Sequence, residues 1–271
     1  MSYLRLGMFA LLLSFATDSL ARTCCDFDLK ENQHHWYAAL GIGDSIDYRA
    51  GAGGYLMTLP PIPQPLPLIL SPQYNSSPIY FQGEVGYTWK NPFAFDPDSR
   101  FFPFMGLGIQ YRYTDQVSLD TPTNFFGIAT RTVPYRLEES SALLNWKIDF
   151  YQWFNRLMPY LNLGLGTSWA RTSQTLPIPA NPNNPTGTLV TTDSQTTTNW
   201  SYNIGAGFDF IVVTNFWLSL GYSYDNFGQL QLGSLNANPE ILSGSNPLFR
   251  PADIGNLHAH NIIFTARYLF G

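Results

Sequence analysis

One sequence feature constrains the fold more than any other, a two-residue alternation that recurs in eight segments between Trp36 and Phe270. Within each segment, of about eleven residues, one parity carries large apolar or aromatic side chains and the other carries Gly, Ser, Asn or charged residues. Successive side chains of a β-strand point to opposite faces, so the alternation predicts strands. The apolar parities run over Trp36–Ile42, Ile79–Trp89, Met105–Tyr113, Ala142–Phe150, Leu161–Trp169, Trp200–Phe210, Phe216–Tyr224 and Ile262–Phe270.

The residues of the opposite parity decide which face points outward. An eight-stranded barrel is only just wide enough to be filled by side chains, so its lumen suits glycines and a few long polar groups better than a dozen large aromatics. The apolar parity must therefore face outward, which requires lipid around the barrel. The sequence predicts an all-β fold: an eight-stranded antiparallel up-and-down transmembrane β-barrel with long extracellular loops.

The placement of the aromatic residues and the composition agree with a membrane barrel. Aromatic rings cluster at the predicted strand ends, as expected for belts at the two lipid headgroup levels. Charged residues make up 12% of the chain, about half the roughly 25% of an ordinary soluble domain. The net charge of -5 offers no basic surface and argues against nucleic acid as a partner. One predicted belt contains Trp36, Trp89, Phe150, Phe216, Tyr268 and Phe270, and the other contains Tyr111, Tyr113, Trp169, Trp200, Tyr202, Tyr222 and Tyr224.

The predicted connections alternate in length, which gives the barrel a direction. Residues 90–102, 151–158 and 213–215 are the shorter connections, whereas 49–77, 114–134, 171–199 and 226–257 are the longer ones. Short periplasmic turns and long extracellular loops are the outer-membrane arrangement. We therefore expect the cell outer membrane of a Gram-negative bacterium as the location, with both chain termini in the periplasm.

The amino terminus has the pattern of an export signal. Residues 1–21 combine Arg5, an apolar run from Leu6 to Ala16 and a small-x-small ending, which predicts a secretory signal peptide. Residues 22–34 then form a periplasmic leader, and residues 35–271 form the barrel. The leader holds Cys24 and Cys25, for which intermolecular disulfides, reactive thiols and no specific role all stay open.

On strand count, loop alternation and the final strand Asn261–Phe270, the chain resembles the eight-stranded outer-membrane β-barrel superfamily, which includes the barrel of outer-membrane protein A, the opacity adhesins and the small X- and W-type barrels. The ending resembles that family's carboxy-terminal assembly signal, although Gly271 follows the terminal Phe270. The resemblance implies outer-membrane lipid, lipopolysaccharide and the barrel-assembly machinery as partners. It is a weak guide to activity.

Seven charged residues lie on the inward parity, and an unpaired charge there would cost several kcal/mol. We expect them to pair, with Lys147 and Arg267 neutralising Asp149 and Asp209 near the periplasmic end. A salt-bridged plug is preferred over an ion path, because a pore would need a wider lumen or one dominant sign of charge. The predicted lumen charge network is Glu84, Arg112, Lys147, Asp149, Asp209, Asp225 and Arg267.

No catalytic residue, cofactor site or metal site is predicted, and the protein is not expected to be an enzyme. The Gly-x-Gly pairs lie inside strands, where small residues let a narrow barrel close. Lipid A deacylases with a Ser-His pair are enzymatic barrels of this size, but neither His258 nor His260 has a His-x-Ser arrangement. We interpret them as rim histidines, and we interpret His34 and His35 as periplasmic residues that precede the first strand.

The long loops are where we expect function. Leu59–Pro72 is rich in proline and apolar residues, which favours an extended polyproline-like segment that either meets a partner or folds over the barrel mouth. The predicted function is a surface barrel with a plugged polar lumen, whose loops 49–77, 171–199 and 226–257 bind host or environmental partners or support the envelope. The alternative is a small channel for hydrophobic solutes, and a lipid-modifying enzyme comes third.

Overall fold

A computed structural model describes residues 34–49, 53–58, 66–70, 78–90, 104–125, 129–153, 156–178, 188–191, 194–231, 248–250 and 253–270. The predicted signal peptide and Cys24 and Cys25 lie outside these residues, as does most of the Leu59–Pro72 segment. The first strand begins at His34, the last residue of the range 22–34 predicted as a leader.

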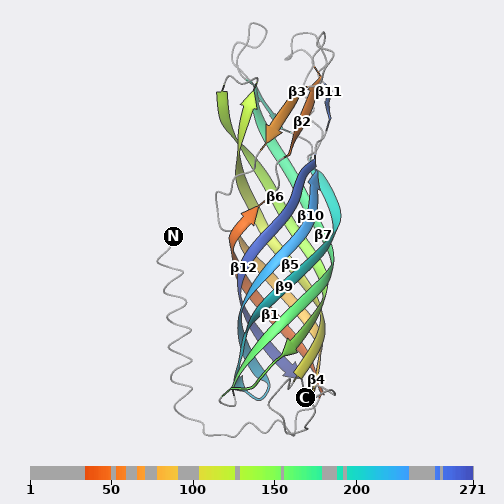
Figure 1. The fold of residues 1–271 in the computed structure, drawn as a ribbon, viewed down its shortest axis with the longest axis vertical. Coiled ribbons are helices and arrows are strands. Elements are labelled where there is room, and N and C mark those ends of the chain that lie inside the picture. Colours follow the sequence, from red (N-terminus) through yellow and green to blue (C-terminus); the bar gives the residue numbers. More distant parts are fainter. Residues whose placement is uncertain are drawn as a thin grey trace, which may run out of the picture.

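Eight long strands form a closed antiparallel barrel (Figure 1). Each strand pairs with the next of the eight along the chain, as β5 does with β6. β1 pairs with β12 and so closes the ring. The eight are β1 (His34–Arg49), β4 (Ile79–Lys90), β5 (Phe104–Phe125), β6 (Ala129–Asp149), β7 (Leu157–Ile178), β9 (Gln195–Val213), β10 (Phe216–Gln231) and β12 (Asp253–Phe270). The predicted fold class is therefore confirmed.

The predicted parity is visible in the exposure of neighbouring residues. On β4, Val85 is 60% exposed on the outer wall while Glu84 is 7% exposed in the lumen. The outer wall is rich in large apolar side chains, from Leu40 and Ile109 to Leu165 and Phe208. Such a wall needs lipid to cover it, as the outer membrane supplies. Within the described residues, no helix is long and apolar enough to cross a membrane.

Several strands run much further than predicted. β5, β6 and β7 contain 22, 21 and 22 residues, against about eleven expected from the alternation. The predicted loop 114–134 is wrong, because β5 and β6 stay paired across it, past a register shift between Thr114 and Val117, to the pair Phe125↔Ala129. An antiparallel ladder satisfies its own backbone hydrogen bonds in water as well as in lipid, so it need not stop at the membrane surface.

The other three long connections also contain strand, so their description as plain loops is corrected. β2 (Gly53–Thr58) and β3 (Leu66–Leu70) lie in 49–77, β8 (Thr188–Thr191) lies in 171–199, and β11 (Leu248–Arg250) lies in 226–257. β2 pairs with both β3 and β11. For Leu66–Leu70, the expected polyproline-like course is wrong, since these residues pair in a sheet.

Inward-pointing tyrosines occupy the space that inward glycines leave. A Cβ added to Gly86 would overlap the ring of Tyr37, one added to Gly108 would overlap the hydroxyl of Tyr37, and one added to Gly43 would overlap Tyr80. In the same way, a Cβ at Gly207 or Gly221 would meet the hydroxyl of Tyr160. The lumen therefore holds more aromatic side chains than the sequence argument allowed, because glycine on the facing strand makes room for each ring.

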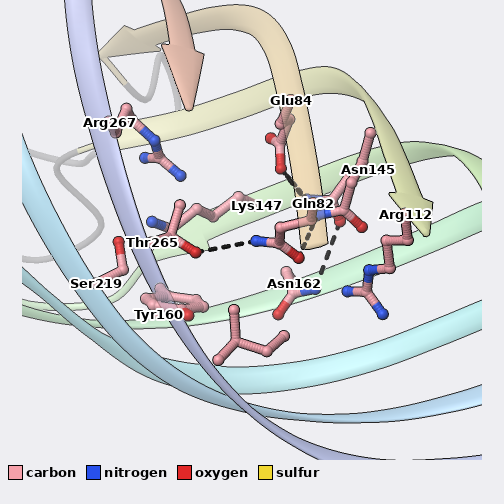
Figure 2. Close-up of a pocket in the computed structure, with 12 residues that line it drawn as sticks. Gln82, Glu84, Arg112, Asn145, Lys147, Tyr160, Asn162, Ser219, Thr265 and Arg267 are labelled. Atoms are coloured by element: carbon pink, nitrogen blue, oxygen red, sulfur yellow. Dashed lines mark hydrogen bonds between the residues drawn. The ribbon is translucent and has the colours of Figure 1, made fainter. Parts of the chain in front are cut away.

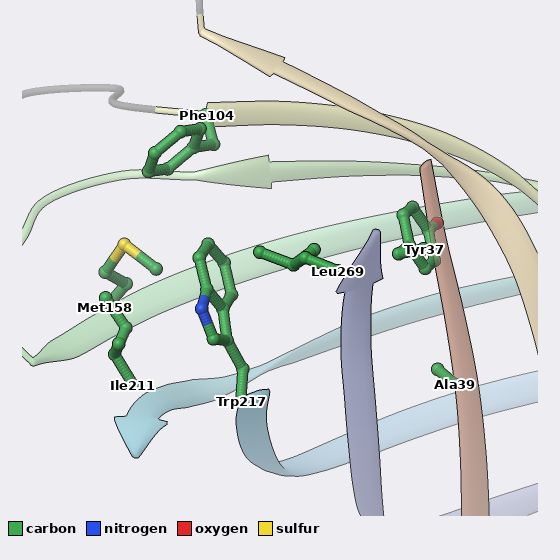
Figure 3. Packing of buried hydrophobic residues seen from close by; sticks show 7 residues of the cluster. All are labelled: Tyr37, Ala39, Phe104, Met158, Ile211, Trp217 and Leu269. Carbon is green, nitrogen blue, oxygen red and sulfur yellow. The ribbon is translucent and has the colours of Figure 1, made fainter. Parts of the chain in front are cut away.

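An apolar cluster fills the periplasmic end of the barrel (Figure 3). Its members come from the first or last residues of six strands, and the rings of Phe104 and Trp217 pack edge to face with centroids 5.6 Å apart. Trp217 is only 1% exposed. The cluster consists of Tyr37, Ala39, Phe104, Met158, Ile211, Trp217 and Leu269.

Candidate functional site: the barrel lumen

The structure places all seven predicted lumen charges on the inner wall, where each is buried. They come from six strands, with Lys147 and Asp149 sharing β6. They separate into a lower cluster above the periplasmic apolar residues, a central carboxylate, and an upper pair.

The lower cluster consists of Lys147, Asp149, Asp209 and Arg267. Lys147 forms an ion pair with Asp209 and lies 3.9 Å from Asp149 (Nζ to Oδ1). The Arg267 guanidinium lies 3.5 Å from Asp209 (Nη1 to Oδ2), and the Ser219 hydroxyl donates to Asp209 at 2.6 Å. Asp209 thus has three donors, which offset the cost of burying its charge.

Both lower cations also lie over aromatic rings. Lys147 Nζ is 4.0 Å from the centroid of the Tyr160 ring, and the Arg267 guanidinium is 4.7 Å from that of Tyr37. A cation over a ring face is attracted by the ring's quadrupole, most strongly where water is excluded. The same tyrosines that fill the space beside the glycines therefore also stabilise the buried charges.

Glu84 is the central carboxylate and is held by neutral donors rather than by an ion pair. The Tyr37 hydroxyl, Gln110 Nε2 at 3.0 Å and Asn145 Nδ2 at 3.1 Å donate to it. Figure 2 shows Glu84 and Asn145 on the inner wall. The tyrosine bonds to Oε1 and the two amides bond to Oε2, so the two carboxylate oxygens together accept all three bonds. Amide side chains of this layer extend the network around a small cavity of about 30 Å³, lined among others by Gln82, Asn162 and Thr265.

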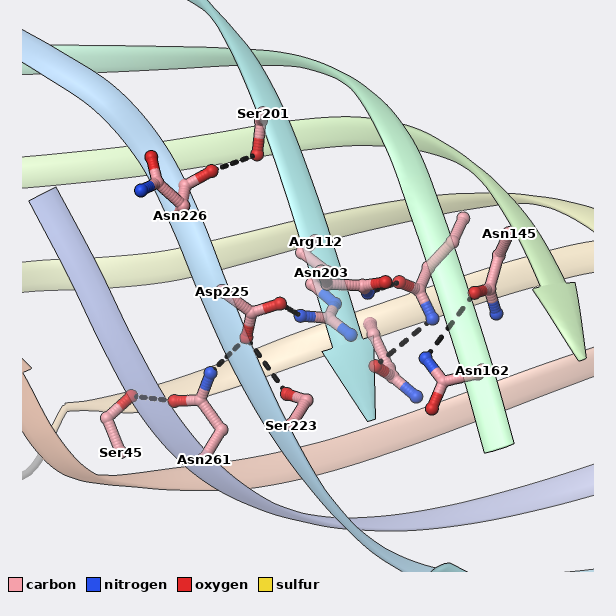
Figure 4. A network of polar contacts seen from close by, with 12 residues as sticks. Ser45, Arg112, Asn145, Asn162, Ser201, Asn203, Ser223, Asp225, Asn226 and Asn261 are labelled. Carbon is pink, nitrogen blue, oxygen red and sulfur yellow. Dashed lines mark hydrogen bonds and ion pairs between the residues drawn. The ribbon is translucent and has the colours of Figure 1, made fainter. Parts of the chain in front are cut away.

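The upper pair is Arg112 on β5 and Asp225 on β10, which form an ion pair across the lumen (Figure 4). Asp225 also accepts hydrogen bonds from Asn261 and, at 2.9 Å, from Ser223. Asn261 in turn accepts from Ser45 on β1. This network ties four strands together at one level of the barrel.

Glu139 belongs to the lumen charges but was missed by the sequence analysis. It is 2% exposed on the inner wall of β6, and Thr114 Oγ1 donates to its Oε2 at 3.2 Å. The signal was present, since Glu139 shares its parity with Lys147 and Asp149, but it lies beyond the apolar residues that marked this strand. With Glu139 included, the buried lumen charges described are three basic and five acidic, rather than the near balance expected.

A segment of β10 turns toward the inside of the barrel at the upper mouth. The β9–β10 ladder ends at Asn226↔Tyr202, whereas β10 continues to pair with β12 as far as Gln231↔Asp253. The bend occurs at Gly228, which has a φ of 79°, a conformation that glycine adopts without strain. We call Phe227–Gln231 the in-turned segment.

Inward side chains of β7 and β9 bond to the backbone of the in-turned segment. Ser168 Oγ donates to the Phe227 carbonyl at 2.7 Å, Thr172 Oγ1 to that of Gln231 at 2.8 Å, and Asn199 Nδ2 to that of Gln229 at 2.6 Å. Because Ser168 and Thr172 are fully buried, the segment lies inside the mouth. Buried apolar side chains occupy the inner wall at this end, namely Val117, Leu137, Ala170, Phe227, Leu230 and Leu257.

The four histidines lie away from the lumen network. His34 and His35 begin β1, and His35 Nδ1 is 3.2 Å from the Phe270 carbonyl at the periplasmic end. His258 and His260 lie on β12 among tyrosine rings of β10. In the part of the chain that the structure describes, no group of three or more His, Cys, Asp or Glu side chains is arranged to hold a metal ion.

Comparison with known proteins gives a family match and distant structural likenesses. Residues 7–270 match the family model described as the outer membrane protein beta-barrel domain. Neisserial surface protein A is 12% identical, with 87% of this chain and 97% of that one covered at a TM-score of 0.38. OprG from Pseudomonas aeruginosa is 10% identical, with 88% and 97% covered at a TM-score of 0.46. The protease OmpT from Escherichia coli is 9% identical, with 87% and 97% covered at a TM-score of 0.46. No curated protein matches the sequence.

Proposed function

The chain belongs to the outer membrane protein β-barrel domain family, and from that premise we propose that it is a closed surface barrel, whose extracellular strands and loops bind a partner outside the cell. The observation that carries the proposal is that side chains or backbone occupy the lumen at three levels. The apolar cluster lies at the periplasmic end, the charged network crosses the middle, and the in-turned segment lies at the mouth.

The strands that leave the membrane supply the surface for a partner. Tyr113 and Trp169 lie opposite each other across β6, both next to Ser140, at the outer aromatic belt. β5 and β6 stay paired for more than ten further residues beyond this level. A paired ribbon holds its side chains in a fixed arrangement, and this favours recognition of a partner over a role as a passive spacer. The proposal includes a host or environmental partner, or a supporting role in the envelope. The partner would bind at 49–77, 171–199 and 226–257.

Conductance in planar bilayers tests the closure. We expect purified barrel, shown to be folded by its heat-modifiable gel mobility, to give no steady single-channel current under conditions in which a porin inserted in the same bilayer conducts. A stable current from the folded wild-type protein would contradict the proposal and favour a channel.

Labelling of intact cells tests which strands are outside. Thr198 on the extracellular part of β9 and Asn215 in the β9–β10 turn are both exposed, so each tolerates a cysteine. With Cys24→Ser/Cys25→Ser as the background, a membrane-impermeant maleimide should label Thr198→Cys and leave Asn215→Cys unlabelled until the outer membrane is permeabilised. The reverse pattern would invert the barrel and remove the proposed binding surface from the cell exterior.

A channel for hydrophobic solutes is the second candidate, and one observation favours it. Above Asn226↔Tyr202, β9 and β10 are no longer joined by a backbone ladder, so this seam of the wall depends on side-chain bonds. Side-chain bonds such as Asn199 to Gln229 bridge the seam. A disulfide in Asn199→Cys/Gln229→Cys should abolish uptake of a hydrophobic dye by liposomes containing the barrel if the seam is a path, and should have no effect if the barrel is closed.

The absence of catalytic activity stays a prediction. The carboxylates of the lower and upper clusters are engaged by buried cations and hydroxyls of the same barrel. A group used in acid–base chemistry must reach a substrate, and these groups are enclosed.

A further inference from the structure

Glu139 on the inner wall of β6 is a buried carboxyl group with few hydrogen-bond donors around it. Asp209 and Glu84 are each bonded by three donors, whereas among the described residues only Thr114 donates to Glu139, at 3.2 Å on Oε2. Glu139 Oε1 is buried without a hydrogen-bond partner in this part of the chain, and so is the hydroxyl of Ser141 on the same face of β6. An ionised carboxylate is costly to bury with a single donor, so this site favours the protonated form.

Glu139 lies outside the apolar band of the membrane. On β6 it is seven residues beyond Trp146, which pairs with Leu163 near the bilayer midplane. At about 3.3 Å per residue and a strand tilt of about 40°, this separation rises roughly 18 Å, more than half the height of an apolar band about 25 Å tall. Glu139 therefore belongs to the extracellular mouth of the barrel and not to its membrane-spanning part.

The charged groups around Glu139 supply no net counter-charge. Arg112 of β5 and Asp225 of β10 are the two charges that act on it, and they neutralise each other in the upper ion pair. Val117 and Leu137 are buried apolar residues at the same end of the inner wall. Burial therefore has the largest effect, followed by the negative charge of Asp225, and together they raise the pKa of Glu139 to about 8.

The in-turned segment is attached at the level of Glu139. Glu139 pairs with Ala170 across β6 and β7. Ser168 and Thr172, the inward residues on either side of Ala170, donate to backbone carbonyls of the in-turned segment at 2.7 and 2.8 Å. None of these three β7 side chains can carry a charge, and Leu230 of the segment is fully buried. A charge on Glu139 is therefore not hydrated while the segment lies in the mouth.

We propose that Glu139 is a pH-dependent switch that controls the in-turned segment. With its proton, Glu139 stays in the closed mouth, donates from Oε1 to Ser141 and accepts from Thr114. When the proton passes to water, the buried charge that remains beside Asp225 is hydrated only if the segment leaves the mouth. The open mouth gives the carboxyl group its ordinary pKa of about 4.3, so the proton binds the closed mouth more tightly than the open one. Opening therefore becomes more frequent as the pH rises from this value to about 8, and levels off above it.

Amide hydrogen exchange of the folded barrel in detergent micelles, between about pH 5.5 and 7.5, tests the switch. After correction for the intrinsic pH dependence of exchange, opening of Phe227–Gln231 should rise about tenfold per pH unit in the wild type, because each opening releases one proton. Glu139→Gln keeps the shape of the protonated side chain without its titration, so its opening should change less than about twofold over this range. The matched control is Glu138→Gln, which removes the same charge from the next residue, on the opposite face of β6, and should keep the wild-type response.

Infrared difference spectra detect the proton without relying on exchange. At about pH 6 the wild type should show the carbonyl band of a protonated carboxyl group that is missing from Glu139→Gln, and this band should fade as the pH passes about 8. Identical spectra of the two proteins would mean that Glu139 is ionised in the closed mouth, and would overturn the proposal.

The exchange data have three further outcomes that would overturn the switch. One is a wild-type pH dependence in Glu139→Gln, and another is a loss of pH dependence in Glu138→Gln. The third is an equal pH response in the β9–β10 ladder below Asn226, which would show that the whole barrel loosens. The charged network and the apolar cluster still occupy the lumen below an open mouth, so none of these outcomes decides whether the barrel conducts.

Discussion

At the scale of single residues, the lumen contains buried ion pairs, and removing one member of such a pair destabilises the barrel. Arg112 and Asp225 form an ion pair in which the side chains are 3% and 2% exposed. Deleting one member of a buried pair leaves an uncompensated charge, which costs more than the pair contributes. Glu139, buried near Arg112 on the facing strand, makes the loss of that cation still less favourable.

Arg112→Met should therefore lower the free energy of unfolding by about 3 kcal/mol or more, measured by urea titration in liposomes. Asp225→Asn keeps a group that Asn261 and Ser223 can bond to. Combined with Arg112→Met, it should recover part of the loss, because the double variant no longer carries an unpaired Asp225 charge. Strict additivity of the two single effects would show that the pair is not coupled.

The match between tyrosine and glycine gives a second prediction at this scale. Gly221→Ala should destabilise the barrel by about 1–3 kcal/mol by overpacking against the Tyr160 hydroxyl. Tyr160→Phe removes that oxygen, so Gly221→Ala/Tyr160→Phe should regain most of the loss. The control is Gly83→Ala, whose new Cβ would come no closer than 3.9 Å to the Leu40 side chain. An equal cost for Gly83→Ala would show that the destabilisation comes from replacing a glycine and not from overlap with the Tyr160 hydroxyl.

At the scale of elements, the in-turned segment is the part of a strand that depends on its neighbours' side chains. β10 has a full ladder with both β9 and β12 up to Asn226, but beyond that point only β12 remains as a backbone partner. Ser168, Thr172 and Asn199 take over the role of the missing ladder. Such a segment opens more easily than a strand paired on both sides.

Ser168→Ala should therefore speed amide hydrogen exchange in Phe227–Gln231 while leaving the β9–β10 ladder below Asn226 protected. The expected cost is about 1 kcal/mol, the usual net value of one hydrogen bond. Thr198→Ala, on the exposed side of β9, serves as the control and should change nothing. Unchanged exchange in Ser168→Ala would mean that the hydroxyl does not hold the segment in the mouth.

At the scale of the whole molecule, the barrel separates a polar interior from a lipid-facing wall, and this separation makes neighbouring residues respond differently. Leu163 is 46% exposed on the outer wall of β7, whereas the next residue inward, Asn162, donates to Asn145 at 3.4 Å. A charge on the wall near the bilayer midplane is far more costly than a polar exchange in a hydrated network.

Leu163→Arg should cost about 2–4 kcal/mol of barrel stability in liposomes, and Asn162→Ser should cost much less. The two variants are compared by urea titration with gel mobility as the measure of folding. Similar costs would mean that Leu163 does not face lipid and that the wall has been assigned to the wrong parity.

The sequence alone determined the number of membrane-spanning strands, their order and the face that meets lipid. These properties are local, because a period of two places Leu163 and Leu165 on one face whatever the rest of the chain does. The placement of Glu84, Arg112, Lys147, Asp149, Asp209, Asp225 and Arg267 in the lumen follows from the same rule. The same rule missed Glu139, because strands outside the membrane lose the apolar alternation that marks a strand in the sequence.

Only the tertiary structure decided which inward groups meet, because that depends on the stagger between strands. Arg112 and Asp225 are 113 residues apart in the sequence, and a register shift of two residues would give each a different partner without changing any parity. The matching of Tyr160 with Gly207 and Gly221, and the turn of β10 into the mouth, depend on the same stagger. A two-residue period carries no information about stagger, which is set when closure of the ring forces every strand into register at once.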